Sequence, residues 1–276
     1  MPRARRSKKA AAPASAEPAA RLLRGPEAAR PLASLIFLAP WLLLYVVGLV
    51  WVRPDLAAGA DILLRELLTL FGVSGALAPT WLAIIVLVLW HLLRRDPWKI
   101  SWGLLGLMAA ETLLLAVPLF ALERVFHAFS HGGWTLALAS HAATHGSPLP
   151  AAGPPGWGGP SAWLEAVMTS IGAGIYEELL FRLLMVGGAL FLLRTVLKDD
   201  SPGAKVAVIL MAAALFAGAH VLGDPRNFRW LSFLFRTAAG IYLGFVFLYR
   251  GFGIAAGVHI VFDLVVKGAA ALNDGG

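Results

Sequence analysis

Long apolar stretches without charged residues restrict the fold of this chain more than any other feature. Residues 31–52 carry no charge, and residues 67–93 contain no Asp, Glu, Lys or Arg. A helix needs roughly 20 residues to cross the hydrocarbon core of a bilayer. Backbone polar groups in lipid must be satisfied within their own segment, so these runs are expected to be helical. The sequence therefore predicts an all-α, polytopic transmembrane helical bundle.

The composition supports this class, because 59% of the residues are hydrophobic and only 14% are charged. A soluble domain carries about a quarter charged residues. We expect about seven spans, with six to eight as the range. Their approximate boundaries are 31–52, 77–94, 101–124, 162–197, 204–222, 231–250 and 253–272.

Two segments depart from a simple span. The fourth span is too long to cross straight, so it either bends near Gly187 and Gly188 or extends beyond the membrane surface. Residues 55–72 place charged residues among leucines, which is typical of an interfacial amphipathic helix.

Three regions are expected along the chain. Residues 1–30 form a disordered, basic, Ala/Pro-rich tail on the cytoplasmic side, and residues 31–160 hold the amino-terminal spans and a loop containing Gly, Pro and His. Residues 161–276 form a carboxyl-terminal helical core, which holds the ionisable residues considered below. We interpret the basic tail as a flank that orients the first span, so we expect no nucleic acid partner.

Basic residues between the spans give the same orientation, with the amino terminus in the cytoplasm and the carboxyl terminus outside. They are Arg94, Arg95, Lys99, Arg194, Lys198, Lys205 and Arg250. The chain has no Cys, which excludes disulfides, thiolate metal sites and a Cys nucleophile.

Four histidines lie in or beside the loop that should face outside. His127 and His131, and likewise His141 and His145, have the i, i+4 spacing that would suit a metal on a helix. Nearby Gly and Pro argue against a helix around the second pair, so we expect exposed or interfacial histidines and no metal.

Ionisable residues inside spans are costly, and here they form a pattern on three spans. The site residues that we select are Glu177, Glu178, Arg182, His220, His259 and Asp263. Spacing of i, i+4 places Glu178 with Arg182, and His259 with Asp263, on shared helix faces. Glu177 is turned about 100° from Glu178 and can face a different cavity.

This arrangement fits hydrolysis by an activated water. A water between Glu177 and His220 could be deprotonated and attack a carbonyl. His259 could stabilise the oxyanion, whereas Asp263 could do so only if protonated and could instead orient His259. Phe216, one turn before His220, is expected to pack against its ring.

A structural reading competes with the catalytic one. A Glu–Arg pair can simply join two spans, and a single His can simply bond a neighbouring helix. Six such residues on three spans favour a site. Glu111 and Arg236 are expected to be architectural, with Arg236 as a possible partner of Glu111, and His91 is expected at the membrane interface.

These motifs resemble the CAAX protease and bacteriocin-processing (CPBP, Abi) family of intramembrane glutamic endopeptidases. Glu-Glu-x-x-x-Arg is residues 177–182, Phe-x-x-x-His is residues 216–220, and His-x-x-x-Asn/Asp is residues 259–263. The stretch from Arg236 to Gly244 also looks like the family. The resemblance covers roughly residues 161–272.

The resemblance implies an endopeptidase in which Glu177 and His220 activate water, and His259 and Asp263 stabilise the oxyanion. Glu178 and Arg182 would support them. We expect no cofactor, although a Glu with two His could in principle bind zinc. Asp263 stands where prenyl endopeptidases have Asn, which favours a bacterial Abi-type protein of the inner membrane.

The expected partners are the lipid bilayer and a peptide or protein substrate that is membrane-associated or secreted. Two other functions remain open: a non-catalytic scaffold or bacteriocin-immunity protein, and a proton-coupled transporter. One geometric conflict also remains. The predicted boundaries place His220 and His259 at opposite membrane surfaces, a mismatch on the order of 15 Å.

Overall fold

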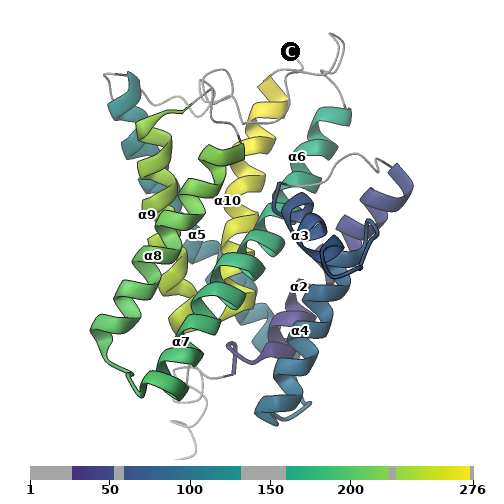
Figure 1. Ribbon diagram of the computed structural model, residues 1–276. Helices are drawn as coiled ribbons and strands as arrows, with labels where there is room; N and C mark the ends of the chain where they lie inside the picture. Colours follow the sequence, from purple (N-terminus) through teal and green to yellow (C-terminus); the bar gives the residue numbers. More distant parts are fainter. Residues whose placement is uncertain (1–26, 53–58, 132–159, 224–227, 274–276) are drawn as a thin grey trace, which may run out of the picture.

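The computed structural model describes residues 27–52, 59–131, 160–223 and 228–273, and within them every regular element is a helix (Figure 1). The predicted all-α bundle is therefore confirmed. The elements are α2 (Pro31–Val47), η1 (Gly48–Val52), α3 (Gly59–Thr69), α4 (Ala78–Arg94), α5 (Trp102–His131), α6 (Pro160–Gly172), η3 (Ala173–Gly187), α7 (Gly188–Leu192), η4 (Leu193–Leu197), α8 (Pro202–Gly223), α9 (Trp230–Arg250) and α10 (Phe252–Asn273). The η elements are π-helical.

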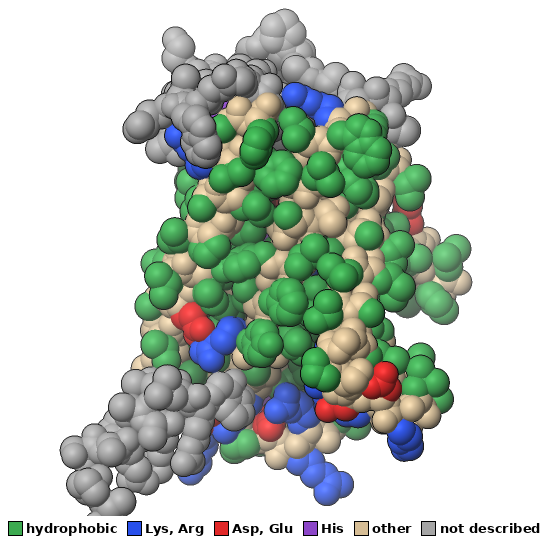
Figure 2. All heavy atoms as spheres, turned by 90° about the vertical axis from the view of Figure 1, so that its left-hand side faces the viewer, with side chains coloured by type: hydrophobic (Ala, Val, Ile, Leu, Met, Phe, Trp, Pro, Cys, Tyr) green, Lys and Arg blue, Asp and Glu red, His purple; other side chains and the backbone are tan. Residues whose placement is uncertain are grey.

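Six helices among the described residues are long and apolar enough to cross a membrane. They are Pro31–Val50, Trp102–Phe129, Trp163–Leu197, Pro202–Leu222, Trp230–Arg250 and Phe252–Ala271. The predicted span 77–94 corresponds to α4, which is apolar but only 17 residues long. Figure 2 shows a broad face of hydrophobic side chains on the bundle. The chain is a multi-pass integral membrane protein.

The fourth predicted span is one continuous helix from Pro160 to Leu197 that changes geometry three times. It is α-helical to Gly172, π-helical from Ala173, α-helical again from Gly188 and π-helical from Leu193. Just before the change, the hydroxyls of Thr169 and Ser170 donate to carbonyl groups one turn back, at 2.8 and 2.6 Å. Such bonds bend helices, and π-helical turns concentrate at functional sites.

Other predictions along the chain have mixed outcomes. The amphipathic segment forms α3, which packs against η3 and α4 and buries Leu64. His141 and His145 lie outside the described residues, as does the tail up to residue 26. His127 is buried by protein, so the exposed position, one of its two predicted alternatives, is wrong.

Helix α10 occupies the middle of the bundle, because it packs against α2, α5, α6, η3 and α9 (Figure 1). Residues near the beginning of the described chain cover the first turns of α10. The turn into α10 is a single glycine, Gly251, with a φ of 86°, and Ala29 lies against it. The amide of Gly253 donates to the hydroxyl of Ser34 at 3.0 Å. The amino-terminal end of α10 is therefore enclosed by protein.

Gly174 lets η3 approach the backbone of α10. A methyl group at this position would lie 2.9 Å from the amide nitrogen of Ile260 and 3.1 Å from the carbonyl oxygen of Ala256. Both atoms belong to the backbone and cannot rotate away. This close approach brings the residues that follow Gly174 on η3 next to the residues around Ile260 on α10.

We expect Gly174→Ala to destabilise the protein by about 1–3 kcal/mol, because η3 and α10 must separate to admit the methyl group. Gly188→Ala is the matched control. It lies in the same continuous helix, and an added methyl group meets nothing within 4 Å. Thermal unfolding of the two purified variants in detergent measures the difference. Equal midpoints would show that the approach at Gly174 is not tight.

Candidate active site

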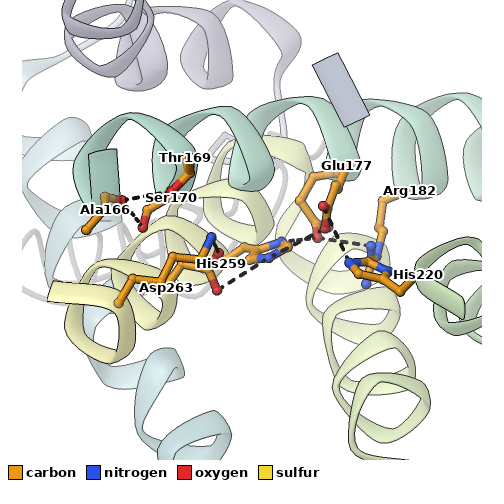
Figure 3. Close-up of polar contacts among 10 residues, drawn as sticks. Ala166, Thr169, Ser170, Glu177, Arg182, His220, His259 and Asp263 are labelled. Carbon is orange, nitrogen blue, oxygen red and sulfur yellow. Dashed lines mark hydrogen bonds and ion pairs between the residues drawn. The ribbon is translucent and has the colours of Figure 1, made fainter. Parts of the chain in front are cut away.

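Three helices bring one carboxylate and two imidazoles together. Figure 3 shows Glu177 of η3, His220 of α8 and His259 of α10 pointing toward one another. The Oε1 atom of Glu177 lies 3.7 Å from Nε2 of His220, and its Oε2 atom lies 3.8 Å from Nε2 of His259. Glu177 and His259 are buried, and His220 is partly exposed. The structure thus gathers residues that are 82 positions apart in the sequence (259 − 177).

The ring of His220 is held by its own helix. Its Nδ1 atom lies 3.0 Å from the carbonyl oxygen of Phe216. A carbonyl oxygen only accepts, so Nδ1 carries the proton and Nε2 is left as the acceptor in the neutral ring. The Phe216 ring contacts His220 edge-on at 4.8 Å, which confirms the predicted packing. His220 therefore presents a hydrogen-bond acceptor to Glu177.

Glu178 and Arg182 form the predicted ion pair, at 3.0 Å between Oε1 and Nη1. Their side chains are 0% and 2% exposed, so both charges are removed from solvent. The guanidinium also lies over the Phe216 ring, 4.5 Å from its centre. Because neither Nη atom has a hydrogen-bond partner among the described residues, Arg182 is held by charge and by the aromatic face.

The same carboxylate orients His259. The Nδ1 atom of His259 donates to Oε1 of Glu178 at 2.9 Å, because an ion-paired carboxylate only accepts. The two neighbouring glutamates therefore have different partners, although both lie beside the same imidazole. Glu178 contacts one nitrogen of the His259 ring, and Glu177 faces the other.

Asp263 has a partner that we did not predict. Its Oδ1 atom lies 3.9 Å from Nε2 of His259, and its Oδ2 atom accepts from the Lys267 ammonium at 2.6 Å. Lys267 follows Asp263 by four residues, so the spacing rule that paired Glu178 with Arg182 would have found it. Ion pairing with Lys267 favours an ionised Asp263, which has no proton to donate.

The predicted depth mismatch between the two histidines is wrong. Both rings contact Phe216, with ring centres 4.8 Å away for His220 and 6.5 Å away for His259. Helix α8 runs obliquely past α10 in Figure 1. The prediction counted residues from the end of each span, as if the helices were parallel. In a tilted helix, that count does not give the depth of a residue.

One further prediction about a charged residue is corrected. Glu111 pairs with Arg250 through both carboxylate oxygens, and not with Arg236. The error arises because this contact joins residues that are not helical neighbours. His91 lies in the last turn of α4, where it is buried and the Trp98 ring covers it edge-on at 4.5 Å.

The arrangement can do acid–base chemistry. Glu177 and Nε2 of His220 are two acceptors facing each other, and Nε2 of His259 faces the second oxygen of the same carboxylate. Among the described residues, no group of three or more His, Asp or Glu side chains is arranged to hold a metal ion. The site is thus a buried glutamate between two oriented imidazoles, within a polytopic membrane bundle.

Comparison with known proteins agrees with this class. Residues 159–265 match the family model described as type II CAAX prenyl endopeptidase Rce1-like. That range contains all six predicted site residues, and it confirms the resemblance to the CAAX protease family. The match supports a CAAX-type intramembrane protease. Comparison with the curated proteins and with the solved structures found no match.

Proposed function

We propose that the protein is an intramembrane glutamic endopeptidase that hydrolyses a peptide bond with a water held between Glu177 and His220. The observation that carries the proposal is the spacing of the three side chains. The gaps of 3.7 and 3.8 Å are too long for direct hydrogen bonds, and a water that bonds to both groups would account for this separation.

A water in this position would donate one hydrogen bond to Glu177 and one to Nε2 of His220. Glu177 takes the proton as the water oxygen bonds to the carbonyl carbon of the substrate, and the carbonyl π electrons move onto its oxygen. When the tetrahedral intermediate collapses, the C–N bond breaks. The proton held by Glu177 passes to the leaving nitrogen, so the carboxylate is restored.

The other site residues support this reaction by orienting or stabilising. Glu178, held by Arg182, fixes the His259 ring so that Nε2 faces the reacting atoms. With Nε2 protonated, His259 donates to the developing oxyanion. Of the two roles open to Asp263, we propose the orienting one, because its ion pair with Lys267 favours the carboxylate form. The reaction requires no metal in this scheme.

The substrate that we propose is a peptide or protein that is membrane-associated or secreted. The basic residues Arg94, Arg194 and Arg250 lie at or beside helix ends of the described chain, consistent with a cytoplasmic amino terminus. We place the protein in a bacterial inner membrane. We propose no nucleic acid partner.

The test compares the membrane and secreted peptides of cells carrying the wild-type protein with those of cells carrying Glu177→Ala. We expect uncleaved precursors to accumulate in the variant and their fragments to disappear. Glu165→Ala is the matched control, because it removes a glutamate from the same helix three turns earlier. Treatment of the purified protein with EDTA should leave the rate unchanged.

The same comparison separates the competing functions. An immunity phenotype that survives Glu177→Ala, with identical peptides in both cells, would establish a non-catalytic scaffold or immunity protein. A proton flux that depends on Glu177, again with identical peptides, would establish a transporter. Either result would end the protease proposal.

A further inference from the structure

We infer that Arg236 is a catalytic residue, which donates hydrogen bonds to the oxyanion that forms when the substrate carbonyl is attacked. This inference rests on the proposed function. It replaces Asp263 as the second donor beside His259 and assigns a role to a residue that the sequence had marked as architectural.

The need for another donor follows from the pairing of Asp263. Its carboxylate accepts from Lys267 at 2.6 Å and faces Nε2 of His259 at 3.9 Å. A carboxylate held in this way repels a developing oxyanion, whereas stabilisation of an oxyanion requires donors aimed at it. His259 alone would remain from the pair that the resemblance implied.

The packing of α9 directs Arg236 toward the site. The preceding residue, Phe235, contacts Phe262 of α10 with ring centres 6.0 Å apart, and Phe262 directly precedes Asp263. One turn after Arg236, Gly240 lies against α8, where a methyl group would be 3.4 Å from the Phe216 ring. Residues four apart share a helix face, so Arg236 lies on the face of α9 that packs against α8, next to the Phe235 position that contacts α10.

The charge of Arg236 acts on the carboxylates of this site. Its guanidinium interacts electrostatically with Glu177 and with Asp263. These are the two carboxylates that face Nε2 of His259, where the reacting carbonyl would lie. The charge of Arg236 therefore acts on the two carboxylates beside the place of the reacting carbonyl.

Arg236 is also available for a substrate. It is half-buried, and no described residue forms a hydrogen bond or an ion pair with it. Arg182 differs because it is 2% exposed, lies under the Phe216 ring and is paired with Glu178. Arg250, at the end of the same helix, is paired with Glu111. Among these three arginines, only Arg236 is partly exposed and also lacks an ion-pair partner within the described part of the chain.

The chemistry of a guanidinium suits this role. It is permanently charged and presents several N–H donors in a planar fork, so it needs no proton from the reaction. Its hydrogen bonds strengthen as negative charge develops on the carbonyl oxygen, which stabilises the transition state more than the bound substrate. The expected signature is an effect on kcat with little effect on KM.

The test uses purified full-length protein in detergent and a peptide that accumulates in Glu177→Ala cells. We expect Arg236→Met to lower kcat by about 10²–10³ and to change KM by less than about threefold. Arg236→Lys, which keeps a charged donor, should recover part of the loss. Thr237→Val is the matched control, because Thr237 bonds only within its own helix, to the Phe233 carbonyl.

Several outcomes would overturn the inference. A kcat within threefold of the wild type in Arg236→Met would do so, and so would a rise in KM with kcat unchanged. If Arg236 only neutralised the nearby carboxylates, Arg236→Met would shift the pH dependence of kcat and leave the plateau value of kcat as in the wild type. If Arg236→Met fails to fold, Arg236→Gln is judged by the same criteria. Cleavage that persists in Glu177→Ala would instead end the proposed function itself.

Discussion

Replacing Glu177 by Gln is expected to slow peptide hydrolysis about 10³-fold while the protein stays folded and inserted. Gln has nearly the same shape as Glu, but its amide cannot accept the proton of the attacking water. Loss of a general base costs about 10²–10⁴ in rate, and we expect kcat to fall by about 10³. Glu177 is not part of the buried ion pair, since Glu178 alone bonds Arg182.

The measurement is turnover of a precursor peptide by the purified variant, with thermal unfolding as the test of folding. Glu165→Gln is the control, because it removes a carboxylate from the same helix outside the site. Glu178→Gln provides a contrast, since we expect it to lower both stability and rate. Wild-type turnover by Glu177→Gln would show that another group removes the proton.

The sequence predicted the local pairs of this site well. Spacing along one helix is sufficient to place Glu178 with Arg182 and Phe216 with His220, and the structure contains both contacts. The missed pair of Asp263 with Lys267 follows the same rule. Such contacts depend only on helical periodicity, which a sequence displays directly.

Contacts between helices could not be predicted in the same way. The partner of Glu111 is Arg250, 139 positions away, and no spacing rule selects it over Arg236. The relation of the two glutamates to His259 depends on how closely η3 and α10 approach at Gly174. That approach depends on three-dimensional packing between helices that are distant in sequence.

Helix tilt and enclosure explain the remaining errors. The predicted spans were treated as upright helices that begin and end at the membrane surface. The structure has α8 oblique to α10, and it covers the start of α10 with residues 29–34 (Figure 1). Hydropathy reports the length of an apolar run, whereas tilt and enclosure are set by packing against neighbouring helices.

The ion pair between Glu178 and Arg182 should give the largest effect on stability. We expect Arg182→Met to destabilise the protein by about 3–5 kcal/mol, because the Glu178 carboxylate would remain buried without its counter-charge. Removing both charges should cost less than removing one, so Glu178→Gln/Arg182→Met should be more stable than Arg182→Met. Denaturant unfolding in detergent, followed by intrinsic Trp fluorescence, measures the series.

The exposed pair of Arg194 with Asp200 is the matched control. Their side chains are 63% and 56% exposed, at a separation of 2.9 Å, and water screens the charges. Arg194→Met should therefore leave the unfolding midpoint almost unchanged. Equal losses in Arg182→Met and in the double variant would show that the packing of Arg182 on Phe216, and not its charge, stabilises the site.

The activity of the double variant then separates the two contributions of Glu178, which are the ion pair with Arg182 and the hydrogen bond to His259. A folded but inactive double variant means that the His259 ring needs the carboxylate for its orientation.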